Sequence, residues 1–542
     1  MPGISFVSDM VEEYGDPNGS AAWFLCDRHD PSAVGYRIVS PDLSARDLTY
    51  GELRESSERL ASSLAALGVG PGDRVATLMG KSSEYLTSLL AIWRLGAVHV
   101  PLFTAFAPPA IALRLTGSAA RIVICDASQL GKLLPGPDMP DPLPWRVVTT
   151  GAPESGTLAF DALLRDAGAP IAPVAVGGEN ALIHIYTSGT TGAPKGVVVP
   201  MRALAAVRAY ARFGLDLHSD DIYWCAADPG WAYGLYYGVL ASLATGTPSL
   251  LIEGGFSPEL TWTVLTRFRV TNFAAAPTIY RALRASRTPV FGSLALRRAS
   301  SAGEPLSPDV NDWAKEALGV EIHDHYGQTE TGMLINNHHH PDLAAPLKRG
   351  SMGRALPGWR AAVLHEDRDE ELSAGEIGRV AMDLPASPFA WFSGYSGDPD
   401  RSAGKFSPDG RWYLTGDLAR VDEAGDFYFS SRDDDVILMA GYRIGPTEVE
   451  AALNSHPSVM ESAAIAVPDE IRGEVLEAFV VLHPSMVRDE AMVSELQQWV
   501  KLRYAAHAYP RQVHFVEALP KTPSGKLQRF LLRQRRQISV HA

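Results

Sequence analysis

The segment Tyr186-Thr-Ser-Gly-Thr-Thr-Gly-Ala-Pro-Lys195-Gly196 is the most informative part of this 542-residue sequence. It follows a short apolar run, Ala181 to Tyr186, which predicts a buried strand. Glycines let a backbone turn sharply and bring its N–H groups close to a ligand, while the hydroxyls and Lys195 add donors and a positive charge. The combination predicts a loop that cradles a polyphosphate. It is not a Walker A loop, because that motif needs G-x-x-x-x-G-K-[ST], and here Pro194 precedes the lysine and Gly196 follows it.

A flexible Gly/Thr linker is the alternative interpretation, and further segments downstream argue against it. These are Ser300–Pro305, Asp324–Gly332, Tyr413–Asp417 and Pro520–Arg529. Together with the first segment they resemble the motifs of the adenylate-forming superfamily, which contains acyl-CoA synthetases, adenylation domains of peptide synthetases and luciferases. The resemblance covers almost the whole chain.

The resemblance implies an α/β fold with two domains. Residues 1–432 would form a large N-terminal domain of layered sheets and helices that binds ATP and the acyl group. Residues 433–542 would form a small mobile α/β domain that carries the catalytic lysine. Two or more domains are also expected from length alone, since 542 residues exceed one ordinary core.

The resemblance also implies a nucleotide site. Tyr326 can stack on a purine, and the Asp417 carboxylate can accept hydrogen bonds from both ribose hydroxyls. The implied nucleotide-binding residues are Thr187, Ser188, Gly189, Thr190, Thr191, Gly192, Lys195, Gly303, Glu304, Pro305, Asp324, His325, Tyr326, Gly327, Gln328, Thr329, Asp417, Arg432, Arg443 and Lys526.

The residues implied as catalytic are Lys526, Arg443, Thr187 and Glu330. Glu330 can hold Mg²⁺ through one carboxylate, because Mg²⁺ takes its other ligands from phosphates and water. The implied reaction has two steps: a carboxylate attacks the α-phosphorus of ATP to give an acyl-adenylate and pyrophosphate, and the thiol of coenzyme A then displaces AMP. ATP, Mg²⁺ and coenzyme A are therefore the expected cofactors and co-substrates.

The second step implies motion of the C-terminal domain. Asp434 matches the hinge of the family, and Gly441 with Tyr442 matches the path of the CoA thiol. A glycine there leaves room for the pantetheine chain to pass.

The acyl pocket implied by the resemblance contains Trp231, Ala232, Tyr233, Ala302 and Gly327. Acetyl-CoA synthetases carry tryptophan at the position of Gly327 and valine at those of Ala232 and Ala302. The smaller residues predict room for an acid larger than acetate: short-branched, medium-chain or aryl. Tyr233 stands where that branch has threonine, and it could form the floor of the pocket or change its shape. On this interpretation, Gly327→Trp should cut activity on acids of four or more carbons and spare acetate.

Three other functions stay open: an acetyl- or propionyl-CoA synthetase, a stand-alone amino-acid or acyl adenylation enzyme that loads a carrier protein, and a non-catalytic nucleotide-binding protein. A non-catalytic protein is disfavoured because the residues implied as catalytic, Lys526, Glu330 and Arg443, are all present. A fused carrier domain is not expected, because the chain ends 16 residues after Lys526 (526 to 542). Asp228 is the nearest acid that could pair with an α-amino group. Oligomeric state is open.

Composition indicates which partners and which cellular location to expect. The net charge of −14 argues against nucleic acid and anionic membranes as partners, so small molecules are the expected ligands. The three cysteines are far apart in sequence, which favours a reducing, cytoplasmic location. Neither a signal peptide nor a run of about 18 apolar residues is visible.

Local patterns predict several elements. Thr49 and Glu52 have capping-box spacing before an amphipathic helix, followed by a strand at 74–79, a helix at 82–95 and a strand at 97–102. Residues 134–156 should be a surface connection.

Three charged or polar stretches are expected to be solvated. His338-His339-His340 should be a loop rather than a metal site, because adjacent side chains cannot all point one way. Asp435 should lie in a solvated turn, and the basic tail from Arg529 to Arg536 should form a solvated helix face.

Overall fold

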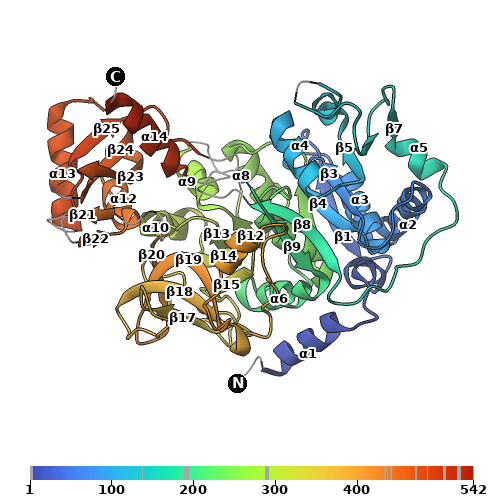
Figure 1. Ribbon diagram of the computed structural model, residues 1–542, viewed down its shortest axis with the longest axis horizontal. Helices are drawn as coiled ribbons and strands as arrows, with labels where there is room; N and C mark the ends of the chain where they lie inside the picture. The colour runs from blue at the N-terminus through green and yellow to red at the C-terminus, as the bar shows by residue number, and fades with distance from the viewer. Residues whose placement is uncertain are drawn as a thin grey trace.

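The computed structural model describes residues 4–136, 138–187, 194–286, 292–432, 435, 437–439, 442–469, 473–484, 486–504, 508–521 and 527–540. Strands in these residues form four sheets, and helices cover them (Figure 1). The α/β fold class is confirmed, with a large N-terminal part and a smaller C-terminal one. None of the described helices combines the length and hydropathy that crossing a bilayer requires.

The largest sheet has nine strands in the order β16-β15-β14-β13-β12-β10-β11-β1-β2. Strands β10, β12, β13 and β14 run parallel, so their carboxyl ends share one edge, while β15 returns antiparallel to β14. The strands are β1 (Val34–Val39), β2 (Ala45–Thr49), β10 (Tyr223–Cys225), β11 (Ser249–Ile252), β12 (Asn272–Ala275), β13 (Arg298–Ala302), β14 (Ile322–Gln328), β15 (Gly332–Asn336) and β16 (Arg354–Ala355).

A second sheet has seven strands in the order β7-β6-β5-β3-β4-β8-β9. The predicted strand before the phosphate loop is confirmed as β8, which pairs antiparallel with β9 and places Thr187 opposite Lys195. The strands are β3 (Arg74–Leu78), β4 (Val98–Pro101), β5 (Ile122–Cys125), β6 (Arg146–Thr149), β7 (Thr157–Ala159), β8 (Ala181–Thr187) and β9 (Lys195–Pro200).

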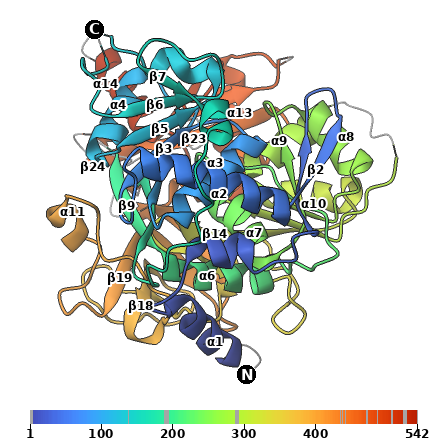
Figure 2. The same ribbon diagram turned by 90° about the vertical axis from the view of Figure 1, so that its right-hand side faces the viewer.

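Helices α2 (Tyr50–Ala66) and α3 (Ser83–Arg94) lie side by side against this sheet (Figure 2). The predicted capping box is confirmed, since the Thr49 side chain accepts from the Glu52 N–H and the Glu52 carboxylate accepts from the Thr49 N–H. The prediction for residues 134–156 is wrong in part. That segment contains β6, whose apolar Val147 and Val148 extend the parallel sheet beside β5.

The remaining helices connect or flank the strands. They are α1 (Ile4–Gly15), α4 (Pro108–Gly117), α5 (Phe160–Arg165), α6 (Leu204–Ala209), α7 (Ala241–Thr245), α8 (Pro258–Arg267), α9 (Pro277–Ala285), α10 (Pro308–Ala317), α11 (Pro399–Ala403), α12 (Pro446–Asn454), α13 (Glu490–Arg503) and α14 (Arg529–Val540).

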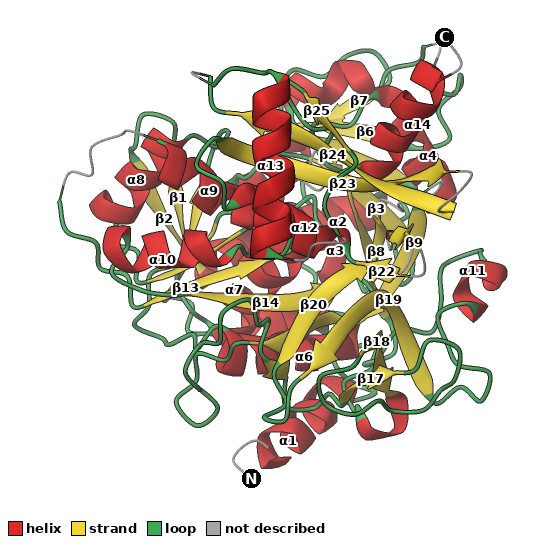
Figure 3. Ribbon diagram, turned by 90° about the vertical axis from the view of Figure 1, so that its left-hand side faces the viewer, coloured by secondary structure: helices red, strands yellow, loops and turns green. Residues whose placement is uncertain are grey.

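Two further sheets complete the chain. Strands β17 (Ala361–Leu364), β18 (Ile377–Asp383), β19 (Trp412–Val421) and β20 (Phe427–Arg432) form an antiparallel meander. The C-terminal sheet contains β21 (Ile437–Met439), β22 (Tyr442–Ile444), β23 (Val459–Asp469), β24 (Gly473–Leu482) and β25 (Gln512–Phe515). Helices α12 and α13 pack together on it (Figure 3). The domain boundary between residues 432 and 433 stays a prediction.

The expectation of a solvated basic tail is wrong. Arg529 donates to both Glu450 oxygens, at 2.8 and 2.7 Å, and to Asp435 at 3.0 Å. Arg533 also pairs with Asp435, which is only 7% exposed, so Asp435 is not a solvated turn residue. Burial of one charge is costly unless an opposite charge is paired with it. The basic face of α14 therefore docks on the C-terminal domain instead of facing water.

Candidate active site

The motif residues gather at the edge where β10, β12, β13 and β14 end. Four segments follow or complete these strands: 226–234 after β10, Ala276 after β12, Gly303–Pro305 after β13, and Tyr326–Thr329 at the end of β14. Ligands of open parallel sheets bind outside the carboxyl ends of the strands. The topology therefore brings together three segments that the motifs predicted to share a site, and it adds Ala276.

The predicted phosphate loop lies between β8 and β9, and its residues 188–193, including Ser188, Gly189, Thr190, Thr191 and Gly192, lie outside the described residues. Its two described ends are informative. Thr187 and Lys195 are paired across the hairpin. The Lys195 ammonium lies 4.9 Å from the centre of the Tyr395 ring, and the Tyr395 hydroxyl donates to Glu330 Oε1 at 2.7 Å. Tyr395 therefore contacts both Lys195 and Glu330.

Glu330 stands at the tip of the β14–β15 hairpin, between the paired residues Gln328 and Gly332. Its side chain is 8% exposed. Oε1 accepts from Tyr395, and Oε2 has no hydrogen-bond partner among the described residues. One oriented carboxylate with an oxygen to spare fits the demand of Mg²⁺ for one or two protein carboxylates beside phosphate oxygens.

Asp417 occupies the centre of a second polar cluster. Its Oδ2 accepts from the Tyr326 hydroxyl at 2.6 Å and from Gln328 Nε2 at 2.7 Å. The Tyr413 hydroxyl donates to Gln328 Oε1 at 2.8 Å and fixes that amide. Burial raises the pKa of the Asp417 carboxyl, and the positive charge of Arg432 opposes that rise. Oδ1 has no hydrogen-bond partner among the described residues, so it is the oxygen that the predicted ribose contact would use.

The segment after β13 supplies the next part of the site. Gly303 has φ of +100°, a conformation that side chains disfavour. Glu304 is held by Arg281 Nη2 at 2.5 Å and by the Thr278 hydroxyl at 3.0 Å. Asp324 lies beside this segment; burial raises the pKa of its carboxyl to about 8. Its Oδ1 is buried without a partner among the described residues, which points to a polar ligand group here.

His325 was predicted to contact the nucleotide, and its imidazole points elsewhere. Its Nδ1 lies 2.7 Å from the Tyr210 hydroxyl, and its Nε2 lies 3.0 Å from the Asn337 carbonyl oxygen. The side chain is 2% exposed. A nucleotide contact at this position would have to come from the backbone.

The predicted acyl-pocket residues follow β10 or end β13. The Trp231 ring lies 5.1 Å from Phe103 and 5.6 Å from Phe106, so the loop after β4 adds an aromatic wall that the motifs did not predict. Ala232 and Tyr233 are half-buried, while Ala302 is 2% exposed. These positions can line a cavity at the same edge as the nucleotide residues.

The interpretation of Gly327 as open space in the pocket wall is wrong for this conformation. A Cβ at residue 327 would point at the partner strand, where it would meet the Gly332 carbonyl oxygen and lie 2.7 Å from Met333 Cα. Real Cβ atoms do not approach backbone atoms that closely. The glycine therefore permits the close approach of β14 to β15 at the bulge between Tyr326 and Gly327.

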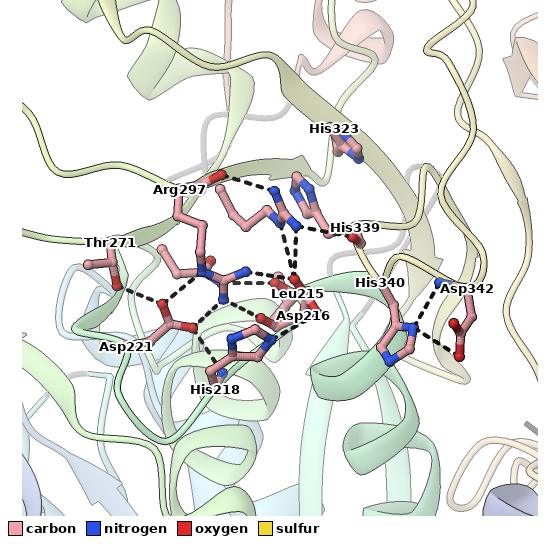
Figure 4. Close-up of polar contacts among 12 residues, drawn as sticks. Leu215, Asp216, His218, Asp221, Thr271, Arg297, His323, His339, His340 and Asp342 are labelled. Carbon is pink, nitrogen blue, oxygen red and sulfur yellow. Dashed lines mark hydrogen bonds and ion pairs between the residues drawn. The ribbon is translucent and has the colours of Figure 1, made fainter.

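The histidine loop after β15 also differs from expectation. His338 and His339 are 6% and 4% exposed, so they are not solvated. His339 Nε2 contacts the Ala299 carbonyl at 3.2 Å and the Ser300 hydroxyl at 3.1 Å on β13. His340 lies apart, beside Asp342 (Figure 4). His339 can be buried there because the Ala299 carbonyl and the Ser300 hydroxyl satisfy its imidazole.

His323, His325 and His339 have ring nitrogens within 4.8 Å of one another, close enough to suggest a metal site. The rings of His323 and His339 are stacked, with centroids 3.6 Å apart and planes at 18°. A metal binds the lone pair in the plane of each ring, and stacked parallel rings do not aim their lone pairs at one point. Both nitrogens of His325 already have partners. The group is a packed, hydrogen-bonded core cluster.

The structure leaves part of the predicted site undescribed. Asp434, Gly441 and Lys526 lie outside the described residues, and for Tyr442 and Arg443 only the backbone of β22 is described. Arg432 ends β20, directly opposite Asp417 in the sheet.

Sequence reasoning missed Tyr395 and Lys405. Lys405 is largely enclosed, and its ammonium donates to the Thr415 carbonyl at 2.8 Å. Burial lowers its pKa, while Glu330 and Asp417 act in the opposite direction. Both residues lie more than 60 positions from Glu330 in sequence. The one local signal is the Gly- and Ser-rich turn around Tyr395, Phe392-Ser-Gly-Tyr-Ser-Gly397.

Asp417→Asn should raise the KM for ATP about 10-fold or more, since a hydrogen bond to a charged group contributes about 1.5–3 kcal/mol. The amide oxygen can still accept from Tyr326 and Gln328, but its NH₂ would face the ribose where an acceptor is needed. Steady-state kinetics with ATP varied measures this. Asp422→Asn is the control, because Asp422 pairs with Lys348 away from this cluster. An unchanged KM would exclude a ribose contact by Asp417.

Comparison with known proteins agrees with these motifs over most of the chain. The family model for AMP-binding enzymes matches residues 30–395, and the model for the AMP-binding enzyme C-terminal domain matches residues 448–526. The acetyl-coenzyme A synthetase of Bacillus subtilis (strain 168) is 34% identical over 527 residues, covering 95% of this chain and 90% of its own. The mitochondrial acyl-coenzyme A synthetase ACSM5 of Homo sapiens is 35% identical over 491 residues, covering 90% and 83%.

Solved structures give the same picture. The acyl-CoA synthetase of Brucella canis has a TM-score of 0.76 and 41% identity, covering 99% of this chain and 97% of its own. The anthranilate CoA ligase AuaEII in complex with anthranoyl-AMP has a TM-score of 0.86 and 28% identity, covering 97% and 98%.

Proposed function

Since this chain belongs to the AMP-binding enzyme family and is an AMP-forming acyl-CoA synthetase, we propose that its acid is larger than acetate: short-branched, medium-chain or aryl. The observation that carries this is the half-buried Ala232–Tyr233 pair at the sheet edge, with alanine where acetyl-CoA synthetases have valine. The likeness to an anthranilate CoA ligase, at 28% identity, supports the aryl option. Gly327 gives no support for a larger pocket, because a Cβ there would face the backbone of β15.

In the first step the protein must bring a carboxylate to a polyphosphate, so its work is positioning and charge stabilisation. Glu330, oriented by Tyr395, would hold Mg²⁺, which when bound neutralises phosphate charge. Lys195, Arg443 and Lys526 would place positive charge around the phosphates. Asp417, Tyr326 and Gln328 would hold the ribose and adenine, so that the α-phosphorus meets the carboxylate from the acyl pocket.

The second step would need the C-terminal domain to turn about Asp434 and carry Lys526 away. Gly441 and Tyr442 would then line the path of the CoA thiol. The cysteines Cys26, Cys125 and Cys225 are all buried and free, which supports a cytoplasmic enzyme.

A pyrophosphate-exchange assay with acetate, propionate, isobutyrate, hexanoate and benzoate, followed by chromatography for acyl-CoA, tests the proposal. Each additional buried methylene is worth about 0.8 kcal/mol, or roughly fourfold. We expect kcat/KM for the best acid to exceed that for acetate by about 10-fold or more. Acetate or propionate as the best substrate would contradict the larger pocket. Exchange without any acyl-CoA would contradict CoA as the acceptor.

A further inference from the structure

A buried chain of hydrogen bonds runs from the sheet edge into the core. The Tyr233 and Tyr210 hydroxyl oxygens lie 3.2 Å apart. Tyr210 in turn contacts His325 Nδ1 at 2.7 Å, and His325 Nε2 contacts the Asn337 carbonyl oxygen at 3.0 Å. The motifs named two members of this chain, Tyr233 and His325, for different roles. Nothing in the sequence connected them.

The donor-to-acceptor direction of these hydrogen bonds is fixed at the inner end, where His325 contacts Asn337. A carbonyl oxygen can only accept, so His325 Nε2 must carry the proton that Asn337 receives. Burial lowers the pKa of His325 well below its ordinary value, and the neighbouring His323 adds to this effect, so the imidazole is neutral. A neutral imidazole has one N–H, which leaves Nδ1 as an acceptor. Tyr210 must therefore donate to Nδ1.

The direction of the remaining hydrogen bond, between Tyr233 and Tyr210, follows from counting the available protons. A tyrosine hydroxyl has one proton, and Tyr210 has used its proton on His325. Its oxygen can only accept from Tyr233 in the 3.2 Å contact. The proton of Tyr233 then points inward, and only lone-pair density on its oxygen is left for anything else.

The inner members cannot reorient easily. Tyr210 is fully buried and packs against Tyr237, with ring centroids 4.4 Å apart. The Asn337 carbonyl oxygen also accepts a hydrogen bond from His323 Nδ1 at 2.8 Å, and the ring of His339 stacks on that of His323. If the hydrogen bonds ran in the opposite direction, one of these contacts would hold two protons or none. A buried polar group would then be unsatisfied, which is costly.

Tyr233 is the end of the chain that can meet a ligand. The neighbouring Tyr236 and Tyr237 are 3% and 1% exposed and have partners of their own, the Thr329 carbonyl and the Met333 N–H. Tyr233 stays half-buried and lies next to Ala232 in the segment after β10. It is therefore the outer end of the hydrogen-bond chain, at the edge where the acyl group is proposed to bind.

We infer that Tyr233 is a specificity-determining hydrogen-bond acceptor in the acyl pocket, and that the preferred acids carry a hydroxyl or amino donor where they reach it. The inference rests on the proposed acyl site and goes further by naming the substituent. A pocket whose free group is an acceptor discriminates against acids that present only an acceptor there, because two lone pairs then face each other.

The test uses the full-length enzyme and benzoates substituted with amino, hydroxyl, methyl or methoxy groups at each ring position. Acyl-CoA formation gives kcat/KM for each acid. At the ring position that reaches Tyr233, amino or hydroxyl should exceed methyl by about three- to tenfold, the value of one hydrogen bond. Tyr233→Phe should bring that ratio to about one.

Tyr210→Phe is the sharper variant, because it leaves Tyr233 in place and removes only the acceptor of its proton. The freed hydroxyl can then donate into the pocket, so the amino-to-methoxy ratio should fall relative to wild type. Comparing ratios between variants cancels the difference in substituent size. Tyr50→Phe is the matched control, since it removes a buried hydroxyl without a hydrogen-bond partner among the described residues. Its ratios should equal those of wild type.

The outcomes separate the inference from the function on which it rests. If no substituted benzoate or aliphatic acid gives acyl-CoA, both fall. If acids are converted but donors have no advantage at any position, the inference alone is overturned. It is also overturned if Tyr233→Phe keeps the donor advantage. Should Tyr210→Phe fold poorly because His325 Nδ1 loses its donor, the Tyr233→Phe result still decides.

Discussion

Lys526→Ala is expected to slow acyl-adenylate formation by about 100- to 1,000-fold, the loss found when one preorganised donor is removed from a developing charge. The expectation rests on the match of Pro520–Arg529 to the family loop, since the structure does not describe Lys526. The first step joins two anions, so a cation between them lowers its barrier. The second step has no such need, and CoA should still react with a supplied acyl-adenylate at close to the wild-type rate.

The two half-reactions can be followed separately, by pyrophosphate exchange and by AMP release from the synthetic adenylate. Lys521→Ala is the matched control, because Lys521 lies in the same segment and pairs with Glu461. It should leave both rates near wild type. Equal loss of both half-reactions in Lys526→Ala would contradict a lysine that serves one step only.

Gly327→Ala should lower kcat/KM for every acid by about 100-fold, without changing the order of preference. The added Cβ would lie 2.7 Å from Met333 Cα and closer still to the Gly332 carbonyl, so β14 and β15 must separate. That hairpin carries Gln328 and Glu330, and a displacement of about 1 Å at a reacting centre can cost about 100-fold. Overpacking should also destabilise the fold by about 1–3 kcal/mol.

A chain-length series of kcat/KM values, with a thermal unfolding curve, measures both effects. Gly131→Ala is the control, since a Cβ there would meet no atom within 4 Å. Gly327→Trp should be at least as damaging as alanine and should not spare acetate. If the tryptophan variant instead kept acetate activity and lost only longer acids, Gly327 would face the acyl group, and the close-approach argument would fall.

The sequence alone determined the elements whose causes are local. The capping box at Thr49 and Glu52 needs two side chains three residues apart, and the helix begins there as predicted. The apolar run before the phosphate loop is a strand because six consecutive residues carry that signal. The motifs also identified the residues that gather at the strand ends, since each is a short segment whose spacing survives in any fold.

Tertiary structure decided what depends on distant partners. His339 looked solvated in sequence, but Ala299 and Ser300, about 40 residues away, supply the acceptors that allow its burial. The arginines of α14 looked exposed until Glu450 and Asp435 were placed beside them. The direction of the Gly327 Cβ depends on a bulge between two strands, and the proton order from Tyr233 to Asn337 depends on four groups from separate elements. Burial and proton direction are properties of a pair of groups, and a sequence pattern describes one group at a time.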